Sequence, residues 1–141
     1  MNYFVDTSFW CALYNVKDIN HHQASILWKK AASQPVKLFV SGYIFDGTIT
    51  LVRMRIGHSH ALELAESLLQ SKVVNFLEAD KEIREKAWQF FKKYAVQDFS
   101  FTDCSSFALM QLYGIKKVLA FDRHFINMNF IMNELYSFIR F

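Results

Sequence analysis

The chain has 141 residues, of which 52% are hydrophobic and 17% aromatic, and its formal net charge is +3. This length suits one domain with one core, spanning residues 1–141, and the apolar excess favours self-association. No apolar run is long enough to span a membrane and no secretory signal is visible, so the sequence predicts a cytoplasmic protein with no membrane partner. Cys11 and Cys104 fall within apolar helical patterns, which predicts buried thiols rather than a disulfide.

Short apolar runs alternate with helical patterns along the chain. The runs predict strands at 2–5, 36–40, 72–77 and 117–121. Each intervening helix is expected to begin after a capping residue. These residues are Thr7 or Ser8, Asn20, Ser41, Ser59, Asp80 and Ser100. A further edge strand at Tyr136–Phe141 is left open. The alternation predicts the α/β class, with a mainly parallel sheet covered by helices on both faces.

Four aspartates lie at the ends of predicted strands or in the first turns of predicted helices. Asp6 and Asp122 each end an apolar run that is predicted to be a strand. Asp103 follows Ser100 by three residues, which is the spacing of a capping box at a helix start. Asp46 lies in an apolar stretch about one turn into the helix after the second strand. Ligands of open α/β sheets bind beyond the carboxyl ends of the strands, so the four acids are expected to face one crevice.

Crowded carboxylates repel one another and need a counter-charge, which Mg²⁺ or Mn²⁺ supplies through oxygen ligands. One such ion can activate a water and polarise a phosphoryl oxygen, and two can clamp the attacking and leaving oxygens. Outside the four acids, the chain has sixteen basic residues against nine acids. A basic surface around an acidic pit attracts a polyanion, so the sequence favours phosphodiester hydrolysis. Taken singly, however, Asp103 also has an ordinary interpretation as a cap, and Asp6 and Asp122 as turn residues. An acid in a stretch as apolar as that around Asp46 needs a partner, so the ordinary interpretation is weakest there.

Four segments in the right order resemble the PIN-domain ribonucleases, and most closely the VapC-type toxins of toxin–antitoxin pairs. They are Phe4-Val5-Asp6-Thr7-Ser8, Asp46 with Thr50-Leu51-Val52-Arg53, Asp98 to Asp103, and Phe121-Asp122-Arg123-His124-Phe125. The resemblance implies a three-layer α/β/α sandwich, a homodimer, cleavage of an RNA substrate with Mg²⁺ or Mn²⁺, and an antitoxin protein encoded nearby that blocks the site.

Carried over by position, the resemblance also assigns roles to individual residues. It makes Asp6, Asp46, Asp103 and Asp122 the catalytic, metal-binding acids. Thr7 and Ser100 become hydroxyls that orient the carboxylates or water. The family usually has Glu where this chain has Asp46, whose shorter side chain would reach a metal only through water. The sequence itself adds three basic residues near the site as candidate RNA contacts, namely Arg53, Arg55 and Arg123.

The first hypothesis is therefore a metal-dependent endoribonuclease that hydrolyses RNA phosphodiester bonds with a metal-activated water. The alternative is a catalytically weak or inactive PIN-like module that binds RNA or protein, and the substitution at Asp46 motivates it. A receiver-like phosphoacceptor domain is a third, more distant idea. The histidines do not show zinc-ligand spacing, and His124 is expected to pack against the rim of the site.

Overall fold

The computed structural model describes residues 1–134. All strand pairs in its five-stranded sheet are parallel, and the strand order is β3-β2-β1-β4-β5. The strands are β1 (Asn2–Val5), β2 (Lys37–Ser41), β3 (Val74–Leu77), β4 (Lys117–Leu119) and β5 (Ile131–Met132). The helices are α1 (Thr7–Tyr14), α2 (His21–Ala32), α3 (Gly42–Arg55), α4 (His58–Gln70), α5 (Lys81–Lys93), α6 (Phe101–Tyr113) and α7 (His124–Asn127).

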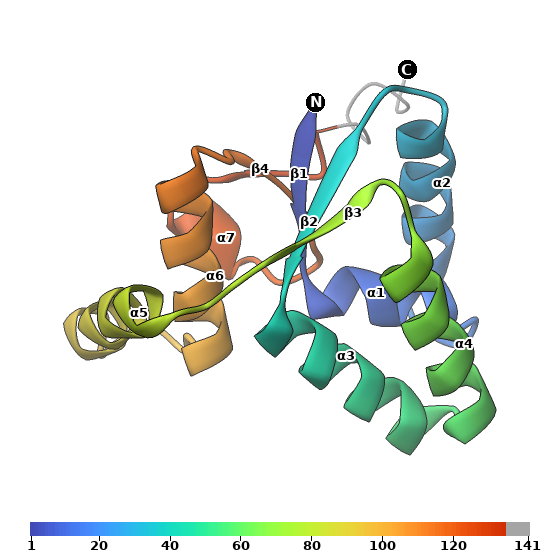
Figure 1. The fold of residues 1–141 in the computed structure, drawn as a ribbon, viewed down its shortest axis with the longest axis horizontal. Coiled ribbons are helices and arrows are strands. Elements are labelled where there is room, and N and C mark those ends of the chain that lie inside the picture. The colour runs from blue at the N-terminus through green and yellow to red at the C-terminus, as the bar shows by residue number, and fades with distance from the viewer. Residues whose placement is uncertain (135–141) are drawn as a thin grey trace.

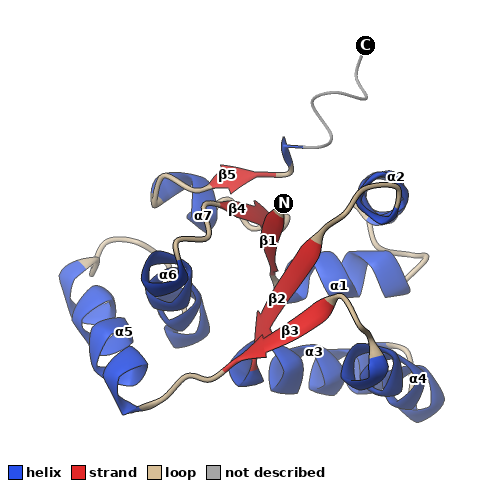
Figure 2. Ribbon diagram, turned by 45° about the horizontal axis from the view of Figure 1, so that its top comes forward, coloured by secondary structure: helices blue, strands red, loops and turns tan. Residues whose placement is uncertain are grey.

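The helices form two layers, one on each side of the sheet. Helices α5, α6 and α7 lie on one side, and α1 to α4 lie on the other, as two views of the ribbon show (Figure 1, Figure 2). Parallel strands require long crossover connections, and helices fill that role while they cover both faces. The predicted α/β/α sandwich with a parallel central sheet is thus confirmed.

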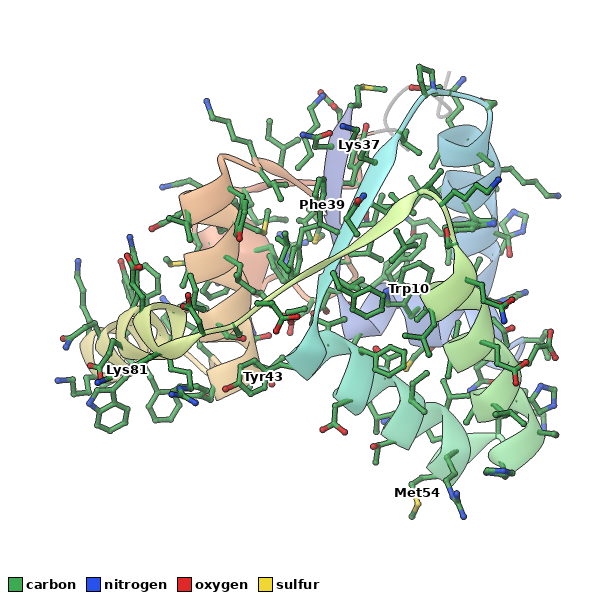
Figure 3. The ribbon with its side chains drawn as sticks, viewed as in Figure 1. Trp10, Lys37, Phe39, Tyr43, Met54 and Lys81 are labelled. Atoms are coloured by element: carbon green, nitrogen blue, oxygen red, sulfur yellow. The ribbon has the colours of Figure 1, made fainter. Side chains whose placement is uncertain are left out.

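The interior explains why the central strand is apolar throughout. Tyr3, Phe4 and Val5 of β1 are fully buried, because β1 has a strand on each side and a helical layer on each face. On the α1 to α4 side, Trp10 lies inside the molecule, whereas Met54 on α3 points outward (Figure 3). Cys11 and Cys104 are both buried free thiols, as predicted. No helix within residues 1–134 has the length and apolar character of a membrane span.

Of the six predicted caps, three make the expected side-chain hydrogen bond, two are wrong, and Asn20 directly precedes α2 without a capping side-chain bond. Ser41, Asp80 and Ser100 each accept a hydrogen bond from the backbone at the start of their helix. Helix α1 is capped instead by Asp6, whose carboxylate accepts from Ser8 N, so the cap precedes the predicted Thr7 or Ser8. Helix α4 begins at His58 rather than after Ser59, and the residue before it is Gly57. Gly57 has a φ of 130°, which favours glycine, so the chain turns there between α3 and α4.

The C-terminal part of the described chain holds two elements that the sequence did not predict. Helix α7 has four residues and β5 has two, so neither is long enough to show a periodic pattern. The fourth predicted strand is correspondingly shorter, because β4 ends at Leu119. The edge strand considered at Tyr136–Phe141 lies outside the described residues.

The carboxyl ends of the parallel strands meet at one edge of the sheet. Asp6 directly follows β1 there, and its backbone N–H donates to Leu119 O at the end of β4, 3.0 Å away. Asp122 follows β4 after a short loop, and α3 begins directly after β2. Residues far apart in the sequence are therefore brought to one rim by the strand order alone.

Candidate active site

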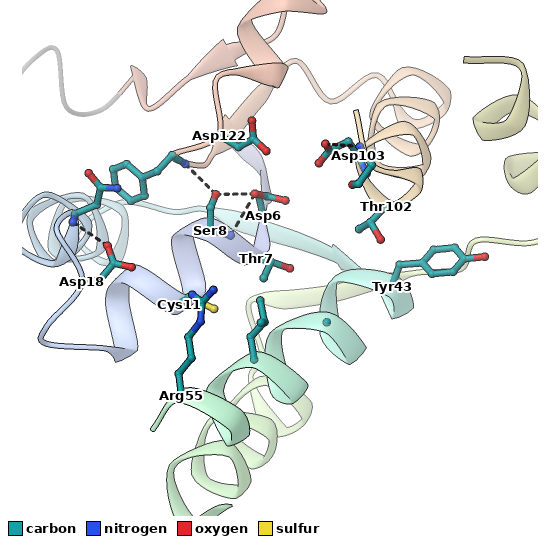
Figure 4. A pocket seen from close by; sticks show the side chains of 15 residues that line it. Asp6, Thr7, Ser8, Cys11, Asp18, Tyr43, Arg55, Thr102, Asp103 and Asp122 are labelled. Carbon is teal, nitrogen blue, oxygen red and sulfur yellow. Dashed lines mark hydrogen bonds between the residues drawn. The ribbon is translucent and has the colours of Figure 1, made fainter. Parts of the chain in front are cut away.

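An open cavity of about 540 Å³ lies at this edge of the sheet. Three of the four predicted acids line it, namely Asp6, Asp103 and Asp122. Their side chains point into the same space, while Arg55 lies at the opposite end of the cavity and extends its side chain toward Cys11 (Figure 4). The acids come from the starts of α1 and α6 and from the loop before α7, so three separate crossovers converge on one site.

Asp6 is held by Ser8, a residue to which the sequence assigned no role in the site. Asp6 Oδ2 accepts from Ser8 N at 3.2 Å and from Ser8 Oγ at 2.6 Å. Ser8 Oγ in turn accepts from Phe121 N at 3.0 Å, next to Asp122. This hydroxyl therefore joins the end of β1 to the end of β4 and fixes the spacing of two acids. A Ser two residues after an acid at the end of a predicted strand was the available signal.

Asp103 serves as both a cap and a cavity residue. Ser100 Oγ accepts from Asp103 N, and Asp103 Oδ2 accepts from Ser100 N, both at 3.0 Å, which completes the predicted capping box. The capping box uses only Oδ2, and the side chain is 9% exposed. The capping interpretation and the metal interpretation therefore do not compete, since the cap orients the carboxylate toward the cavity.

His124 bridges two of the acids. Its Nδ1 lies 2.9 Å from Asp103 Oδ2 and 3.0 Å from Asp122 Oδ1. Asp122 Oδ1 also accepts from His124 N at 2.9 Å, and the His124 ring meets the Phe99 ring edge-on at 5.1 Å between centroids. Sequence reasoning placed His124 at the rim as a packing residue and missed this bridge. Asp103, Asp122 and His124 together offer three candidate ligand atoms that lie within 4.8 Å of one another.

The three carboxylates share one arrangement. Each has one oxygen engaged by the protein and a second oxygen with no hydrogen-bond partner among residues 1–134. The free oxygens are Asp6 Oδ1, Asp103 Oδ1 and Asp122 Oδ2. Oriented, unpaired carboxylate oxygens are the ligands that Mg²⁺ and Mn²⁺ prefer, so the donor set fits such a cation.

The raised pKa of Asp6 indicates that a positive charge in the acid cavity would be stabilising. The pKa of Asp6 is raised from its ordinary value of 3.8 to about 6, chiefly by burial. The hydrogen bonds from Ser8 act to lower this pKa, and the nearby carboxylates of Asp103 and Asp122 act to raise it. Asp6 is only 5% exposed, so its charged form is poorly solvated. A cation between the acids would remove this penalty.

The fourth predicted acid, Asp46, does not share the cavity. The residues of α3 that line it are Tyr43, Gly47, Leu51 and Arg55, each four positions from the last. Asp46 precedes Gly47 by one residue, which is about 100° around a helix of 3.6 residues per turn, and it is exposed. Asp46 therefore lies on another side of α3, contrary to the expectation that it faces the crevice. Gly47 occupies the facing position and carries no side chain.

Thr7 lies in the cavity but does not contact a carboxylate. Its Oγ1 accepts from Thr48 Oγ1 at 3.1 Å and donates to Ile44 O at 3.5 Å, which ties α1 to α3. Ser8 performs the orienting role that the resemblance assigned to Thr7, whereas Ser100 contacts Asp103 as expected.

The three candidate RNA contacts are placed differently from one another. Arg55 lines the cavity and makes no ion pair with any residue in the 1–134 range. Arg53 lies on another side of α3, where its Nη1 is 3.0 Å from His58 Nδ1. Arg123 is exposed at the start of α7 and is not part of the cavity lining. Only Arg55 therefore shares a surface with the three acids.

Comparison with known proteins identifies the family to which this fold belongs. The PIN domain family model matches residues 3–131, and the chain belongs to this family. The 23S rRNA-specific endonuclease VapC20 of Mycobacterium tuberculosis is 38% identical over 128 residues, which cover 91% of this chain and 95% of VapC20. A VapC ribonuclease of Archaeoglobus fulgidus is 28% identical over 123 residues, which cover 86% of this chain and 77% of that protein.

Solved structures give the same result. The crystal structure of M. tuberculosis VapC20, a sarcin–ricin-loop-cleaving toxin, superimposes with a TM-score of 0.84 at 35% identity and covers 93% of this chain and 97% of that one. VapBC2 from Rickettsia felis, bound to a promoter DNA fragment, shares the fold at 10% identity, with a TM-score of 0.66 and coverage of 94% and 97%. The predicted resemblance to VapC-type proteins and the predicted VapC-like endoribonuclease class are confirmed.

Proposed function

We propose that the protein cleaves RNA with the help of Mg²⁺ or Mn²⁺ held by Asp6, Asp103 and Asp122. The observation that carries this proposal is the common arrangement of the three carboxylates, in which the protein orients one oxygen of each and leaves the other open to the cavity. A divalent cation in this site would polarise a phosphoryl oxygen and favour ionisation of a nearby water. The protein's own part is to hold the acids in place through Ser8, Ser100 and His124.

The name of one relative supports a substrate class. VapC20 is named for its action on 23S rRNA, and this chain covers nearly all of VapC20 at 38% identity. We therefore propose ribosomal RNA as the substrate class. We further propose that an antitoxin encoded nearby blocks the cavity, because the R. felis neighbour is a VapBC complex.

Self-association is a further part of the proposal. Several exposed apolar side chains lie on α3, α4 and the edge strand β3. They include Met54, Leu62, Leu69 and Phe76, which are between 37% and 77% exposed. Exposed apolar surface of this kind marks protein contacts, so we propose that the protein is a homodimer in solution.

Metal removal tests the proposed chemistry directly. Purified protein should cleave ribosomal RNA in Mn²⁺ or Mg²⁺, lose this activity in EDTA, and regain it when the cation is restored. Calorimetry should separately detect Mn²⁺ binding to the unmutated protein and much weaker binding to Asp103→Asn, which measures the site without relying on cleavage. Cleavage that persists undiminished in EDTA would contradict a metal-dependent mechanism.

Arg55 gives a second expected result. It stands at the end of the cavity away from the acids, with no anionic partner among residues 1–134, so its guanidinium is available to a phosphate of the substrate. Arg55→Ala should weaken RNA binding roughly tenfold, the loss expected for one charge-assisted hydrogen bond. Arg53→Ala is the matched control two residues away, off the cavity, and its RNA affinity should stay within about twofold. Equal effects of the two substitutions, measured by fluorescence anisotropy, would show that only general charge matters.

The alternative function, an inactive binding module, is favoured by one observation. The residues of α3 that line the cavity are Tyr43, Gly47, Leu51 and Arg55, so this helix contributes no carboxylate to the site. Three acids in place of four reduce the charge available to hold a cation. The unmutated protein would then bind RNA but not cleave it at any Mn²⁺ concentration.

A further inference from the structure

Two large aromatic side chains are exposed side by side on α5. Trp88 is 46% exposed and Phe91 is 43% exposed, and their rings stack with centroids 6.1 Å apart and an interplanar angle of 20°. They are three residues apart on a helix, so both project from the same side. Exposed, adjacent rings of this size are unfavourable in water and mark a binding surface.

These rings lead toward the acid cavity. The Phe91 ring lies 6.0 Å from the Phe101 ring at the start of α6, and the Phe101 ring lies 6.4 Å from the Tyr43 ring. Tyr43 belongs to the lining of the acid cavity, and its side chain points away from the three aspartates (Figure 4). We call these four residues, Tyr43, Phe101, Phe91 and Trp88, the aromatic track.

A second open cavity, of about 600 Å³, lies beside Phe91 and Trp88, the two residues of the track that are farther from the acid cavity. Trp88, Phe91 and Lys92 line it from α5, and Phe99 and Ser100 line it from the loop before α6. Ser100 also lines the acid cavity, so the two cavities adjoin at this residue. A ligand that extended from the acid cavity past Ser100 into the second cavity would meet the rings of Trp88 and Phe91.

The charge around the track is mainly positive, although Asp98 also lines the second cavity. Lys92, which lines that cavity too, places its Nζ 5.4 Å from the centre of the Trp88 ring. Helix α5 as a whole has five basic residues and two acidic ones. Ammonium groups beside exposed rings complement a ligand that carries both flat apolar groups and negative charges.

The same charge disfavours a second copy of the chain as the occupant. A symmetric contact through this face would bring the basic helix α5 of one copy against that of the other, and like charges repel across an interface. Unpaired nucleotides meet both requirements of the surface, because their bases stack on aromatic rings while their phosphates attract lysines. Paired RNA does not, since its bases are stacked inside the duplex.

We propose that the aromatic track binds unpaired nucleotides of the RNA substrate next to the bond that is cleaved. Bases stack on Phe91 and Trp88, and Lys92 contacts the backbone between them. The identity of the ligand rests on the proposed ribonuclease function, whereas the surface itself is independent of the acids. The track thereby selects a single-stranded loop over a duplex.

Binding without cleavage tests this proposal. Fluorescence anisotropy in EDTA measures the affinity for a labelled single-stranded RNA while no metal is present. Trp88→Ala and Phe91→Ala should each weaken binding roughly tenfold, the effect expected for the loss of one stacked base. Trp88→Phe, which keeps an aromatic face, should retain most of the affinity. Tyr113→Ala removes an aromatic side chain that is 52% exposed at the other end of α6, and it should leave binding unchanged.

The possible outcomes separate this proposal from the proposed function. Unchanged RNA affinity in the Trp88→Ala, Phe91→Ala double variant, with an unchanged circular dichroism spectrum, overturns the track. A double variant that dissociates into monomers by light scattering but binds RNA normally also overturns it and assigns the face to a second copy. Failure of the unmutated protein to cleave RNA in Mn²⁺ counts against the ribonuclease function alone, because binding in EDTA is measured separately.

Discussion

Asp6→Asn should abolish RNA cleavage and also make the metal-free protein more stable at pH 8. The first effect follows because the variant loses one of three carboxylates in the cavity, and with it several kcal/mol of charge stabilisation, so the rate should fall at least roughly a hundredfold. Helix α1 should survive the change, since Asn is as good an N-cap as Asp and its amide oxygen can accept the two bonds from Ser8.

The stability gain follows from the raised pKa of Asp6. Because this pKa is about 6 in the folded protein and 3.8 when unperturbed, the folded state holds the proton more tightly than the unfolded state. Ionised Asp6 therefore lowers the free energy of unfolding above about pH 6, by about 2 to 3 kcal/mol for a shift of this size. Asn removes this penalty at pH 8, and the gain should disappear as the pH falls through 6 to below 4.

Urea denaturation in EDTA at several pH values, together with an RNA cleavage assay in Mn²⁺, measures both effects. Asp46→Asn is the matched control, because Asp46 is exposed and does not line the cavity. This control should retain cleavage and show no comparable gain in stability. If Asp46→Asn is inactive while Asp6→Asn cleaves normally, the assignment of the site is wrong.

Gly47→Glu should strengthen Mn²⁺ binding roughly tenfold, because it adds a carboxylate at the position of α3 that faces the three acids and affinity rises with the charge of the ligand set. The site has room for the side chain, since a Cβ at this position would meet only Thr7 Oγ1, at an ordinary contact distance of 3.8 Å. Cleavage should increase at Mn²⁺ concentrations below saturation.

Two matched variants isolate the effect of the new carboxylate. Gly47→Ala gains the helix stability that any residue gains over Gly, of about 1 kcal/mol, but should leave Mn²⁺ affinity unchanged. Asp46→Glu lengthens an exposed side chain on another side of α3 and should also leave it unchanged. Calorimetric titration with Mn²⁺ distinguishes these cases. A larger gain from Asp46→Glu than from Gly47→Glu would show that α3 faces the site in a different phase.

The sequence predicted the parts of the site that depend on topology and on local capping. Asp6 and Asp122 could be placed because they follow apolar strands, and Asp103 because a capping box fixes it in the first turn of α6. Asp46 could not be placed, because a shift of one residue turns a side chain by about 100° and an apolar stretch does not fix that phase.

The missed contacts depend on distances across the fold. His124 joins Asp103 over 21 residues, and Ser8 joins Phe121 over 113, so no local pattern could reveal either bond. The bridge by His124 also depends on α7, whose four residues gave no periodic signal. Topology thus brings the acids to one rim, and these long-range hydrogen bonds set their orientation.

The burial of Asp6 has a consequence for the lifetime of the protein. Without a cation, ionised Asp6 lowers the free energy of unfolding, so the ion-free form should open more often and be digested faster by a nonspecific protease at pH 8. Saturating Mn²⁺ should slow this digestion in the unmutated chain and have little effect on Asp6→Asn. The supply of divalent ions would then govern how long the protein survives as well as how fast it works.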